Sequence, residues 1–308
     1  MDRRELPVHA SARDLLARVE LTIARRLDGL LQGDYRGLLN GQGSELGETR
    51  PYQPGDDVRR IDWNVTARTD APHTRDTIAD RELETWLAVD LSPSLDFGTA
   101  RCTKRELAVT ATAAIGFLTA RTGNRFGLVV AGGERLDVVA ARSGRPHLLA
   151  ALHRVADTPP AAAIPGRTDL AAVVERLTLL HRRRGLAVVV SDFLAPEPWA
   201  PSFARLAVRH DVLAIEIVDP RELELPDVGS LFLVDPETGR SREVHTSAKV
   251  RARYQEAATA QRDRIAADLR RAGVDHLQLR TDRDWLDDLV RFVELRRQRL
   301  ARAARPRR

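Results

Sequence analysis

The chain has 308 residues, of which 43% are hydrophobic and 30% are charged, as expected for a globular protein with an ample core. The single cysteine, Cys102, excludes a disulfide framework and a zinc site built from cysteines. The net charge of +5 arises at the C-terminal end, since seven arginines follow Glu294 and without them 42 basic residues face 44 acidic ones. We therefore expect a solvated basic tail over residues 296–308, and the rest is not a basic nucleic-acid-binding domain.

The chain contains no apolar run close to the ~20 residues that a membrane-spanning helix needs. Its first residues, MDRRELPVHASARDLL, lack the apolar stretch of a signal peptide. A single free cysteine is compatible with a reducing compartment. We therefore expect a cytoplasmic protein without a membrane span and without a specific nucleic-acid partner.

Residues 9–31 carry apolar side chains at spacings of three and four, which predicts an amphipathic helix. Residues 32–83 are predicted to be irregular, and from residue 84 onward strands and helices alternate. The predicted strands are 85–91, 125–131, 136–141, 186–191, 211–218 and 275–279. The predicted helices are 100–121, 145–156, 169–182, 199–209, 247–272 and 284–303. This alternation predicts an α/β fold with a doubly wound, mostly parallel sheet of about six strands, of Rossmann type.

The same patterns suggest a domain organisation. Residues 1–83 are expected to form an N-terminal helix and a charged segment that pack on the main domain. The main domain is predicted to span residues 84–295, with a hairpin appendage near residues 228–245.

The sequence Asp90-Leu91-Ser92-Pro93-Ser94 follows the first predicted strand of the main domain. In an open α/β sheet, ligands bind outside the carboxyl ends of the strands, where the strand order reverses. Carboxylate and hydroxyl oxygens are hard ligands that suit Mg²⁺ or Mn²⁺. The alternative interpretation is that Asp90 and a serine cap the next helix. Two later residues favour the metal: Thr168 stands before a predicted helix, and Asp192 ends a second buried strand.

Residues 50–75 alternate in charge and include two aromatic residues. We expect the charged and aromatic residues to form either a network of ion pairs that pins the segment to the sheet or a partner-docking surface. These residues are Tyr52, Asp56, Asp57, Arg59, Arg60, Asp62, Trp63 and Arg68. We expect Trp63 to be largely buried, because an irregular segment with few backbone hydrogen bonds needs an apolar anchor. We also expect at least one of the arginines to pair with a nearby aspartate.

The Asp-x-Ser-x-Ser sequence, followed by Thr168 and Asp192, resembles the metal-ion-dependent adhesion site (MIDAS) of von Willebrand factor A-type domains. The stretch from Arg50 to Trp63, the Asp-x-Ser-x-Ser-Leu-x-Phe-Gly sequence and Ser191-Asp192-Phe193-Leu194 resemble the domain-of-unknown-function 58 family of bacterial proteins. The one departure is Leu95, where methionine is usual in that family. The resemblance implies a von Willebrand A-like fold with one hairpin inside a parallel sheet.

The resemblance also implies a function. Ser92, Ser94 and Thr168 would ligate the metal through their hydroxyls, and Asp90 and Asp192 would ligate it directly or through water. A partner carboxylate would then fill the open position of the metal, and family members are associated with MoxR-type AAA ATPases in chaperone-like remodelling or maturation. Two alternatives stay open, a metal-assisted hydrolase and a structural domain with a vestigial site. We favour a non-catalytic module, because the chain has no nucleophile elbow and no phosphate-binding loop.

Overall fold

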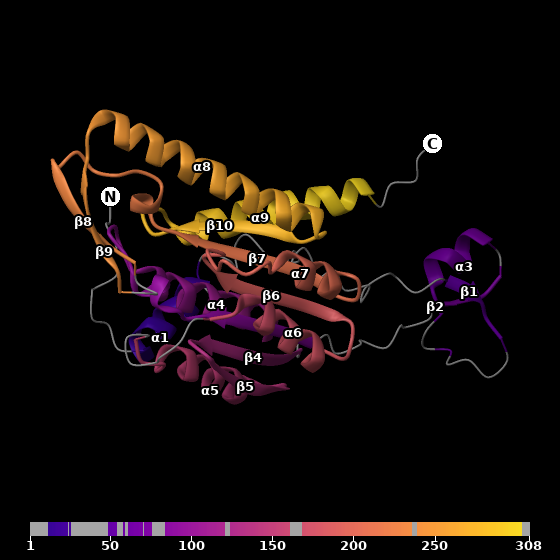
Figure 1. Ribbon diagram of the computed structural model, residues 1–308. Helices are drawn as coiled ribbons and strands as arrows, with labels where there is room; N and C mark the ends of the chain where they lie inside the picture. Colours follow the sequence, from indigo (N-terminus) through magenta and orange to yellow (C-terminus); the bar gives the residue numbers. More distant parts are fainter. Residues whose placement is uncertain are drawn as a thin grey trace. The chain divides into compact units, whose positions relative to one another are not determined.

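The computed structural model (Figure 1) describes residues 12–23, 25, 49–53, 58, 61–69, 71–75, 84–120, 124–160, 168–235 and 239–303. The chain divides into two compact units, of which one comprises residues 1–39 and 84–308 and the other residues 40–83. The larger unit contains a six-stranded sheet, and the smaller unit contains the charged segment of residues 50–75.

The sheet of the larger unit has the strand order β10-β7-β6-β3-β4-β5. Its strands are β3 (Glu84–Asp90), β4 (Arg125–Gly132), β5 (Arg135–Arg142), β6 (Gly185–Ser191), β7 (Asp211–Val218) and β10 (Asp275–Arg280). All neighbours are parallel except β4 and β5, which form an antiparallel hairpin. The predicted doubly wound, mostly parallel sheet is confirmed. The strand order reverses between β3 and β6, and this is the place where such folds bind ligands.

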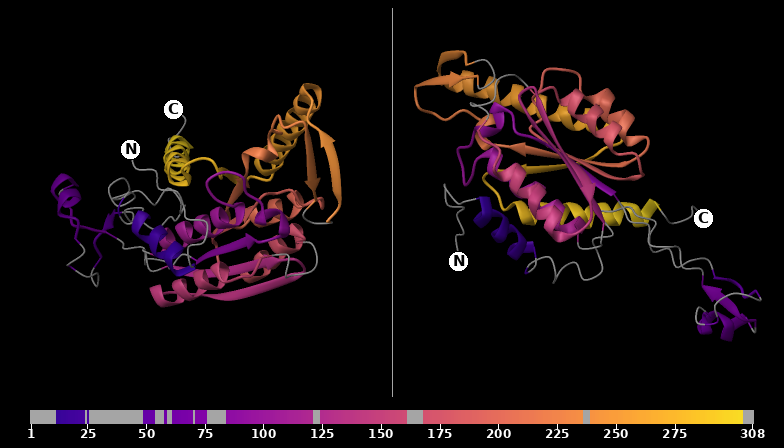
Figure 2. Two further views of the ribbon diagram at one scale, coloured as in Figure 1. Left: turned by 90° about the vertical axis from the view of Figure 1, so that its left-hand side faces the viewer. Right: turned by 90° about the horizontal axis from the view of Figure 1, so that it is seen from below.

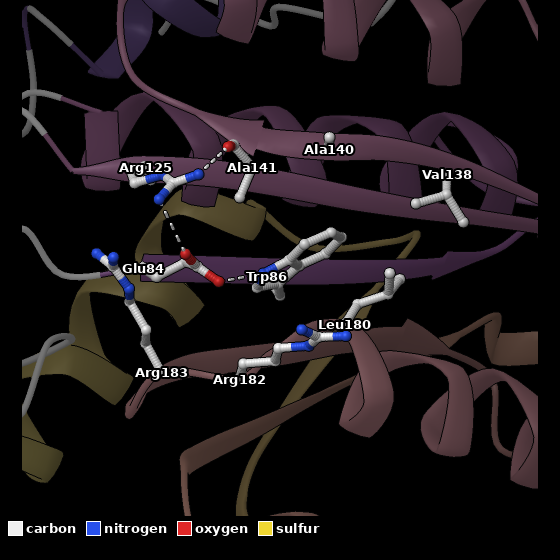
Figure 3. A pocket seen from close by; sticks show the side chains of 9 residues that line it. All are labelled: Glu84, Trp86, Arg125, Val138, Ala140, Ala141, Leu180, Arg182 and Arg183. Carbon is white, nitrogen blue, oxygen red and sulfur yellow. Dashed lines mark hydrogen bonds and ion pairs between the residues drawn. The ribbon is translucent and has the colours of Figure 1, made fainter.

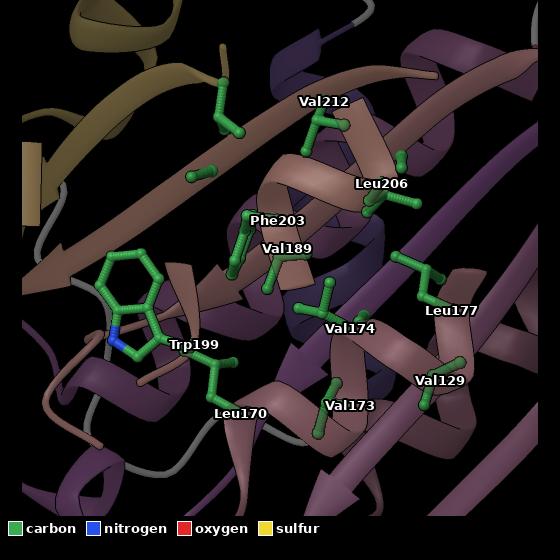
Figure 4. Close-up of a cluster of buried hydrophobic side chains, with 14 of the residues drawn as sticks. Val129, Leu170, Val173, Val174, Leu177, Val189, Trp199, Phe203, Leu206 and Val212 are labelled. Carbon is green, nitrogen blue, oxygen red and sulfur yellow. The ribbon is translucent and has the colours of Figure 1, made fainter. Parts of the chain in front are cut away.

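Helices cover both faces of this sheet (Figure 2). The helices of the larger unit are α1 (Ala12–Thr22), α4 (Lys104–Ala120), α5 (Arg145–Ala156), α6 (Leu170–Leu180), α7 (Ala200–Ala207), α8 (Ala248–Arg271) and α9 (Trp285–Ala303). One apolar cluster joins α6, α7 and α8 to the inner strands, and Figure 4 shows Val173, Val174 and Phe203 within it. All seven residues of β3 are buried, as expected for a central parallel strand that is covered on both faces.

The described chain begins and ends with a helix. The predicted helix 9–31 is seen as α1, which packs against α4 and α5, and its predicted ends lie outside the described residues. The predicted helix 284–303 is seen as α9, so the first residues of the expected basic tail 296–308 lie in this helix, and the expectation that Arg296 is solvated is wrong. Arg296 is only 4% exposed and donates a hydrogen bond from Nε to Asp275 Oδ2 at 2.6 Å. The carboxylate of Asp275 therefore compensates the charge of the buried guanidinium, which allows Arg296 to pack against the domain.

The predicted hairpin appendage is present as the antiparallel strands β8 (Ser230–Val234) and β9 (Ser241–His245). It lies beside the N-terminal half of α8 (Figure 1). Ser247 caps α8 by accepting a hydrogen bond from Val250 N, so the chain passes directly from the hairpin into the longest helix.

The described residues of the smaller unit form regular structure, contrary to the prediction of an irregular segment. Strands β1 (Thr49–Pro51) and β2 (His73–Arg75) are antiparallel, and α3 (Trp63–Thr69) lies between them in the sequence. Asp62 caps α3 through Oδ1, which accepts hydrogen bonds from Asn64 N at 3.1 Å and from Val65 N at 3.3 Å.

The prediction that Trp63 is buried is wrong, since this side chain is 69% exposed. The physical reason is that the segment makes backbone hydrogen bonds of its own, such as Asp62 N to His73 O at 2.8 Å, and does not depend on an aromatic anchor. Arg68 donates to the carbonyl of Asn64 at 3.3 Å. The other charged residues of the expected network, Asp56, Asp57, Arg59 and Arg60, lie outside the described residues, so that expectation stays a prediction.

Candidate metal-binding site

The Asp-x-Ser-x-Ser sequence forms a tight turn at the carboxyl end of β3. Asp90 is the last residue of the strand, and its Oδ1 accepts a hydrogen bond from Ser92 N at 2.9 Å. A short 3₁₀ helix, η4 (Pro93–Asp96), follows directly. This turn brings the hydroxyl oxygens of Ser92 and Ser94 to 3.1 Å from each other. Ser92 stands at the N-cap of η4 but makes no side-chain capping bond, so its hydroxyl does not serve as a cap.

The carboxyl end of β6 brings the second aspartate to the same place. Ser191 Oγ donates to Asp90 Oδ2 at 2.8 Å, which links the ends of the two neighbouring strands. Asp192 comes next, and its Oδ1 accepts from Leu194 N at 3.1 Å. Ser94 also donates to the carboxylate of Asp192. Four of the five predicted site residues are therefore joined by hydrogen bonds at the point where the strand order reverses.

The chain turns sharply after Asp192 because Phe193 has a φ of 57°, in the left-handed region that side chains rarely adopt. Phe193 N donates to Ser191 Oγ at 3.1 Å. Its ring is buried against Trp199 and Phe203, with centroid distances of 5.3 Å and 5.8 Å. This aromatic packing offsets the backbone strain and fixes the position of Asp192.

Thr168 is the fifth predicted residue and lies just before α6. Asp169 caps this helix by accepting from Ala172 N at 3.1 Å. Because α6 returns the chain to the start of β6, it begins at the carboxyl edge of the sheet, the edge of Asp90 and Asp192. Thr168 is buried, and its hydroxyl has no hydrogen-bond partner among the described residues. A buried hydroxyl without a partner costs about 1–3 kcal/mol, and a ligand bound to this oxygen would offset that cost.

The two carboxylates of the site differ in their affinity for protons. Burial, followed by the nearby charge of Asp192, raises the pKa of Asp90 to about 6. Burial also acts to raise the pKa of Asp192, but the ammonium of Lys104 and hydrogen bonds lower it below its usual value. The site therefore holds one carboxylate that stays ionised and one that is more easily protonated.

Sequence reasoning missed the basic group of the site, Lys104. This residue is the first of α4, and it donates from Nζ to Asp192 Oδ2 at 2.8 Å. Its ammonium also donates to Glu222 Oε1 at 2.5 Å. A lysine in the first turn of a helix normally faces solvent, so the sequence carries no signal of its burial.

A separate cavity of about 320 Å³ lies at the opposite edge of the sheet (Figure 3). Glu84 and Arg125 start their strands there, and Trp86 Nε1 donates to Glu84 Oε1 at 2.7 Å. Arg182 and Arg183 follow α6 and line the same cavity. None of its lining residues belongs to the candidate metal site.

Over the described ranges, no group of three or more His, Cys, Asp or Glu side chains could hold a metal ion. The candidate set consists instead of two carboxylates and three hydroxyls. No helix in this part of the chain is long and apolar enough to cross a bilayer.

The fold and this edge of the sheet define an α/β protein of the doubly wound class with a polar site at the strand-order reversal. The chain belongs to the DUF58 family, described as "Protein of unknown function DUF58", whose model matches residues 48–264. It is 54% identical over 282 residues to the uncharacterized protein Rv1480 of Mycobacterium tuberculosis, covering 92% of this chain and 89% of that protein. It is 48% identical over 159 residues to the uncharacterized protein MAV169 of Mycobacterium avium, covering 52% of this chain and 94% of that protein.

Several solved structures match this chain at low sequence identity. The protein BatB of Bacteroides thetaiotaomicron is 14% identical with a TM-score of 0.46, over 70% of this chain and 99% of that chain. The SpRpn10 VWA domain is 15% identical with a TM-score of 0.39, over 68% and 93% of the two chains. A von Willebrand factor type A protein of Catenulispora acidiphila is 14% identical with a TM-score of 0.38, over 73% and 43%. The fold class stated above rests on the strand order of this chain itself.

Proposed function

We propose that this chain is a non-catalytic protein-interaction module that binds its partner through a divalent cation, Mg²⁺ or Mn²⁺. The observation that carries the proposal is the buried hydroxyl of Thr168, which lacks a partner in the described structure and lies at the edge where Ser92, Ser94 and Asp192 meet. Buried hydroxyls in proteins are mostly paired, and this partnerless one lies at the same end of the sheet as the other predicted ligands.

The residues present fit a hard cation. Ser92, Ser94 and Thr168 would hold it through neutral hydroxyl oxygens, and Asp90 and Asp192 would hold it directly or through water. The bound cation would supply residual positive charge and an open position for a carboxylate oxygen. The hydrogen bonds from Ser191 to Asp90 and from Leu194 to Asp192 orient both carboxylates in advance.

We further propose that the partner presents a glutamate or aspartate to this site, and that it is a MoxR-type AAA ATPase engaged in remodelling or maturation. The support for an acidic contact is the chemistry of the site, since a cation held partly by neutral ligands attracts an additional anionic ligand. The support for the ATPase is the resemblance to the DUF58 family alone.

The metal part is tested by thermal unfolding in EDTA and in millimolar Mg²⁺ or Mn²⁺. A ligand at a hundred times its Kd stabilises the folded state by about 2.7 kcal/mol, so the wild type should melt at a higher temperature with metal. Asp90→Ala and Thr168→Val should lose this shift. Thr112→Val is the matched control, because the Thr112 hydroxyl is also buried without a partner among the described residues but lies on α4, in the core. Equal shifts in all four proteins would contradict the proposed site.

The partner part is tested by capture of a purified MoxR-type AAA ATPase from the same organism. Binding should fall in EDTA and in Asp90→Ala and should return when Mg²⁺ is restored to the wild type. Binding that is indifferent to EDTA would contradict metal-dependent docking. Metal-dependent hydrolysis of phosphoesters or peptides that Asp192→Ala abolishes would favour a hydrolase instead.

A further inference from the structure

Lys104 is the largest of the side chains that are less than 2% exposed in the described structure. Its ammonium lies between two carboxylates, 2.8 Å from Asp192 Oδ2 and 2.5 Å from Glu222 Oε1. These partners come from the end of β6 and from the short helix η6 (Pro220–Glu222). A fully buried cation is therefore in direct contact with a predicted metal ligand.

The position of this lysine is costly for the fold. Removing an ammonium from water costs several kcal/mol unless its partners are well placed. Lys104 is also the first residue of α4, after the N-cap Thr103, whose Oγ1 accepts from Glu106 N at 3.1 Å. The N-terminal end of a helix favours negative rather than positive charge. A lysine is thus placed where neither burial nor the helix dipole favours it, which indicates a role at the site.

The positive charge of Lys104 balances part of the negative charge of the predicted ligands. Asp90 and Asp192 contribute two negative charges, and the three hydroxyls contribute none. Each described oxygen of these carboxylates already accepts a hydrogen bond: Asp90 from Ser92 N and Ser191 Oγ, and Asp192 from Leu194 N and Lys104 Nζ. The carboxylates are therefore held in place by protein groups alone, and one of them by a positive charge.

We propose that Lys104 is a built-in counter-ion of the metal site, which holds Asp192 in place in the metal-free protein and weakens the binding of a divalent cation. This inference rests on the proposed metal site. A lysine charge beside Asp192 repels an incoming cation and occupies one of the oxygens that could serve it. Weak binding to the chain alone makes the cation depend on an additional ligand, which is the carboxylate of the partner. Lys104 is in this sense a positioning residue that links metal loading to partner binding.

The lysine is also connected beyond the site. Glu222, its second partner, accepts from Arg262 Nη2 at 3.0 Å, and Arg262 Nη1 donates to the carbonyl of Asp192 at 3.0 Å. The ammonium is therefore held from two sides by groups anchored to α8, which keeps it beside Asp192 when no metal is bound.

The test is calorimetric titration of Mn²⁺ into the wild type, Lys104→Met and the double variant Lys104→Met with Glu222→Gln. The double variant removes the lysine together with one carboxylate, so it preserves the net charge and is available should the single variant not fold. We expect the variants to bind Mn²⁺ about tenfold or more tightly than the wild type, because a buried positive charge next to the ligand set is gone. In EDTA they should melt below the wild type, and Mn²⁺ should restore the loss. Addition of Asp90→Ala to either variant should abolish the binding.

The outcomes separate this inference from the proposed function. Unchanged or weaker Mn²⁺ binding in the variants, with clear binding by the wild type, would overturn the role of Lys104 and leave the metal site standing. Binding by the variants alone would support the counter-ion, because the wild type then needs the partner's carboxylate to hold the cation, and the partner capture in EDTA and Mg²⁺ tests that dependence separately. Absence of binding in all of them would overturn both.

Discussion

Arg262 of α8 donates from Nη1 to Oε1 of Glu216 on β7, at 2.8 Å, in the interior between the helix and the sheet. The Glu216 side chain is fully buried, and its other oxygen lies 2.9 Å from His276 Nε2 and accepts from Gln278 Nε2 at 3.0 Å. Burial acts to raise the pKa of Glu216, but the effects of His276 and Arg262 are larger and opposite. The pKa of Glu216 therefore lies below its usual value. The longest helix is thus joined to the sheet through an ionised group.

Removal of Arg262 should therefore be severe. Arg262→Met leaves Glu216 as a buried charge without its guanidinium, and breaking such a pair costs about 3–5 kcal/mol. Urea unfolding followed by circular dichroism measures the loss. The double variant Arg262→Met with Glu216→Gln should recover a large part of it, because both charges are then absent. A single variant as stable as the wild type would mean that the pair is not buried.

The stacked pair of His181 and His210, with ring centroids 4.0 Å apart, should make the fold sensitive to acid. Burial, followed by the neighbouring His210, lowers the pKa of His181 to about 3. Between about pH 6.5 and 3, His181 is protonated in the unfolded chain but neutral in the folded protein. Proton binding therefore favours the unfolded state, and the free energy of unfolding decreases as the pH falls through that range. The loss amounts to about 1.4 kcal/mol per pH unit below 6.5 for one histidine.

The matched variant is His181→Gln, whose amide can still donate to the carbonyl of Glu84, which lies 3.2 Å from His181 Nε2. Unfolding at pH 7 and pH 5 should show a smaller loss in the variant than in the wild type. The raised pKa of Asp90 acts in the opposite direction in both proteins, so the difference between them reports His181. Equal losses would show that the imidazole takes up its proton in the folded state.

Two glycines should differ in their tolerance of alanine. A Cβ on Gly127 of β4 would lie 2.6 Å from the indole ring of Trp86, whereas a Cβ on Gly116 of α4 would lie 2.8 Å from the end of the Leu148 side chain. A buried indole cannot move aside easily, so Gly127→Ala should cost about 1–3 kcal/mol or more. A leucine methyl can rotate, and alanine favours a helix over glycine by about 1 kcal/mol. Thermal unfolding should therefore show the larger loss for Gly127→Ala, and the reverse order would contradict this packing.

The two tryptophans Trp63 and Trp199 give a matched test of exposure. Trp63→Ala should change the free energy of unfolding by no more than about 0.5 kcal/mol, because the side chain is mostly in solvent. Trp199→Ala removes a buried ring from between Phe193 and Phe203 and should cost about 3–5 kcal/mol. Limited proteolysis and urea unfolding measure both. Strong destabilisation by Trp63→Ala would show that its ring is covered.

Much of the fold follows from local pattern. The predicted ranges 145–156 and 211–218 coincide with α5 and β7, and the other strands of the sheet differ from prediction by one residue at one or both ends. Apolar runs and turn residues determine such elements through neighbours in the sequence, so a single chain is sufficient to recognise them. The same reasoning placed Asp90 and Asp192 at one edge, because parallel strands end together.

The burial of individual side chains depended on the tertiary structure and could not be predicted from the sequence pattern. Trp63 was expected to be a buried anchor, yet its side chain is exposed, since this segment forms hydrogen-bonded structure of its own. Lys104 and Glu222, 118 positions apart, meet at the site only because separate elements converge there. Sequence determined which carboxylates and hydroxyls stand at the strand ends. Only the packing of α4 against the sheet decided that a lysine is buried among them, because burial of a charge depends on partners distant in the chain.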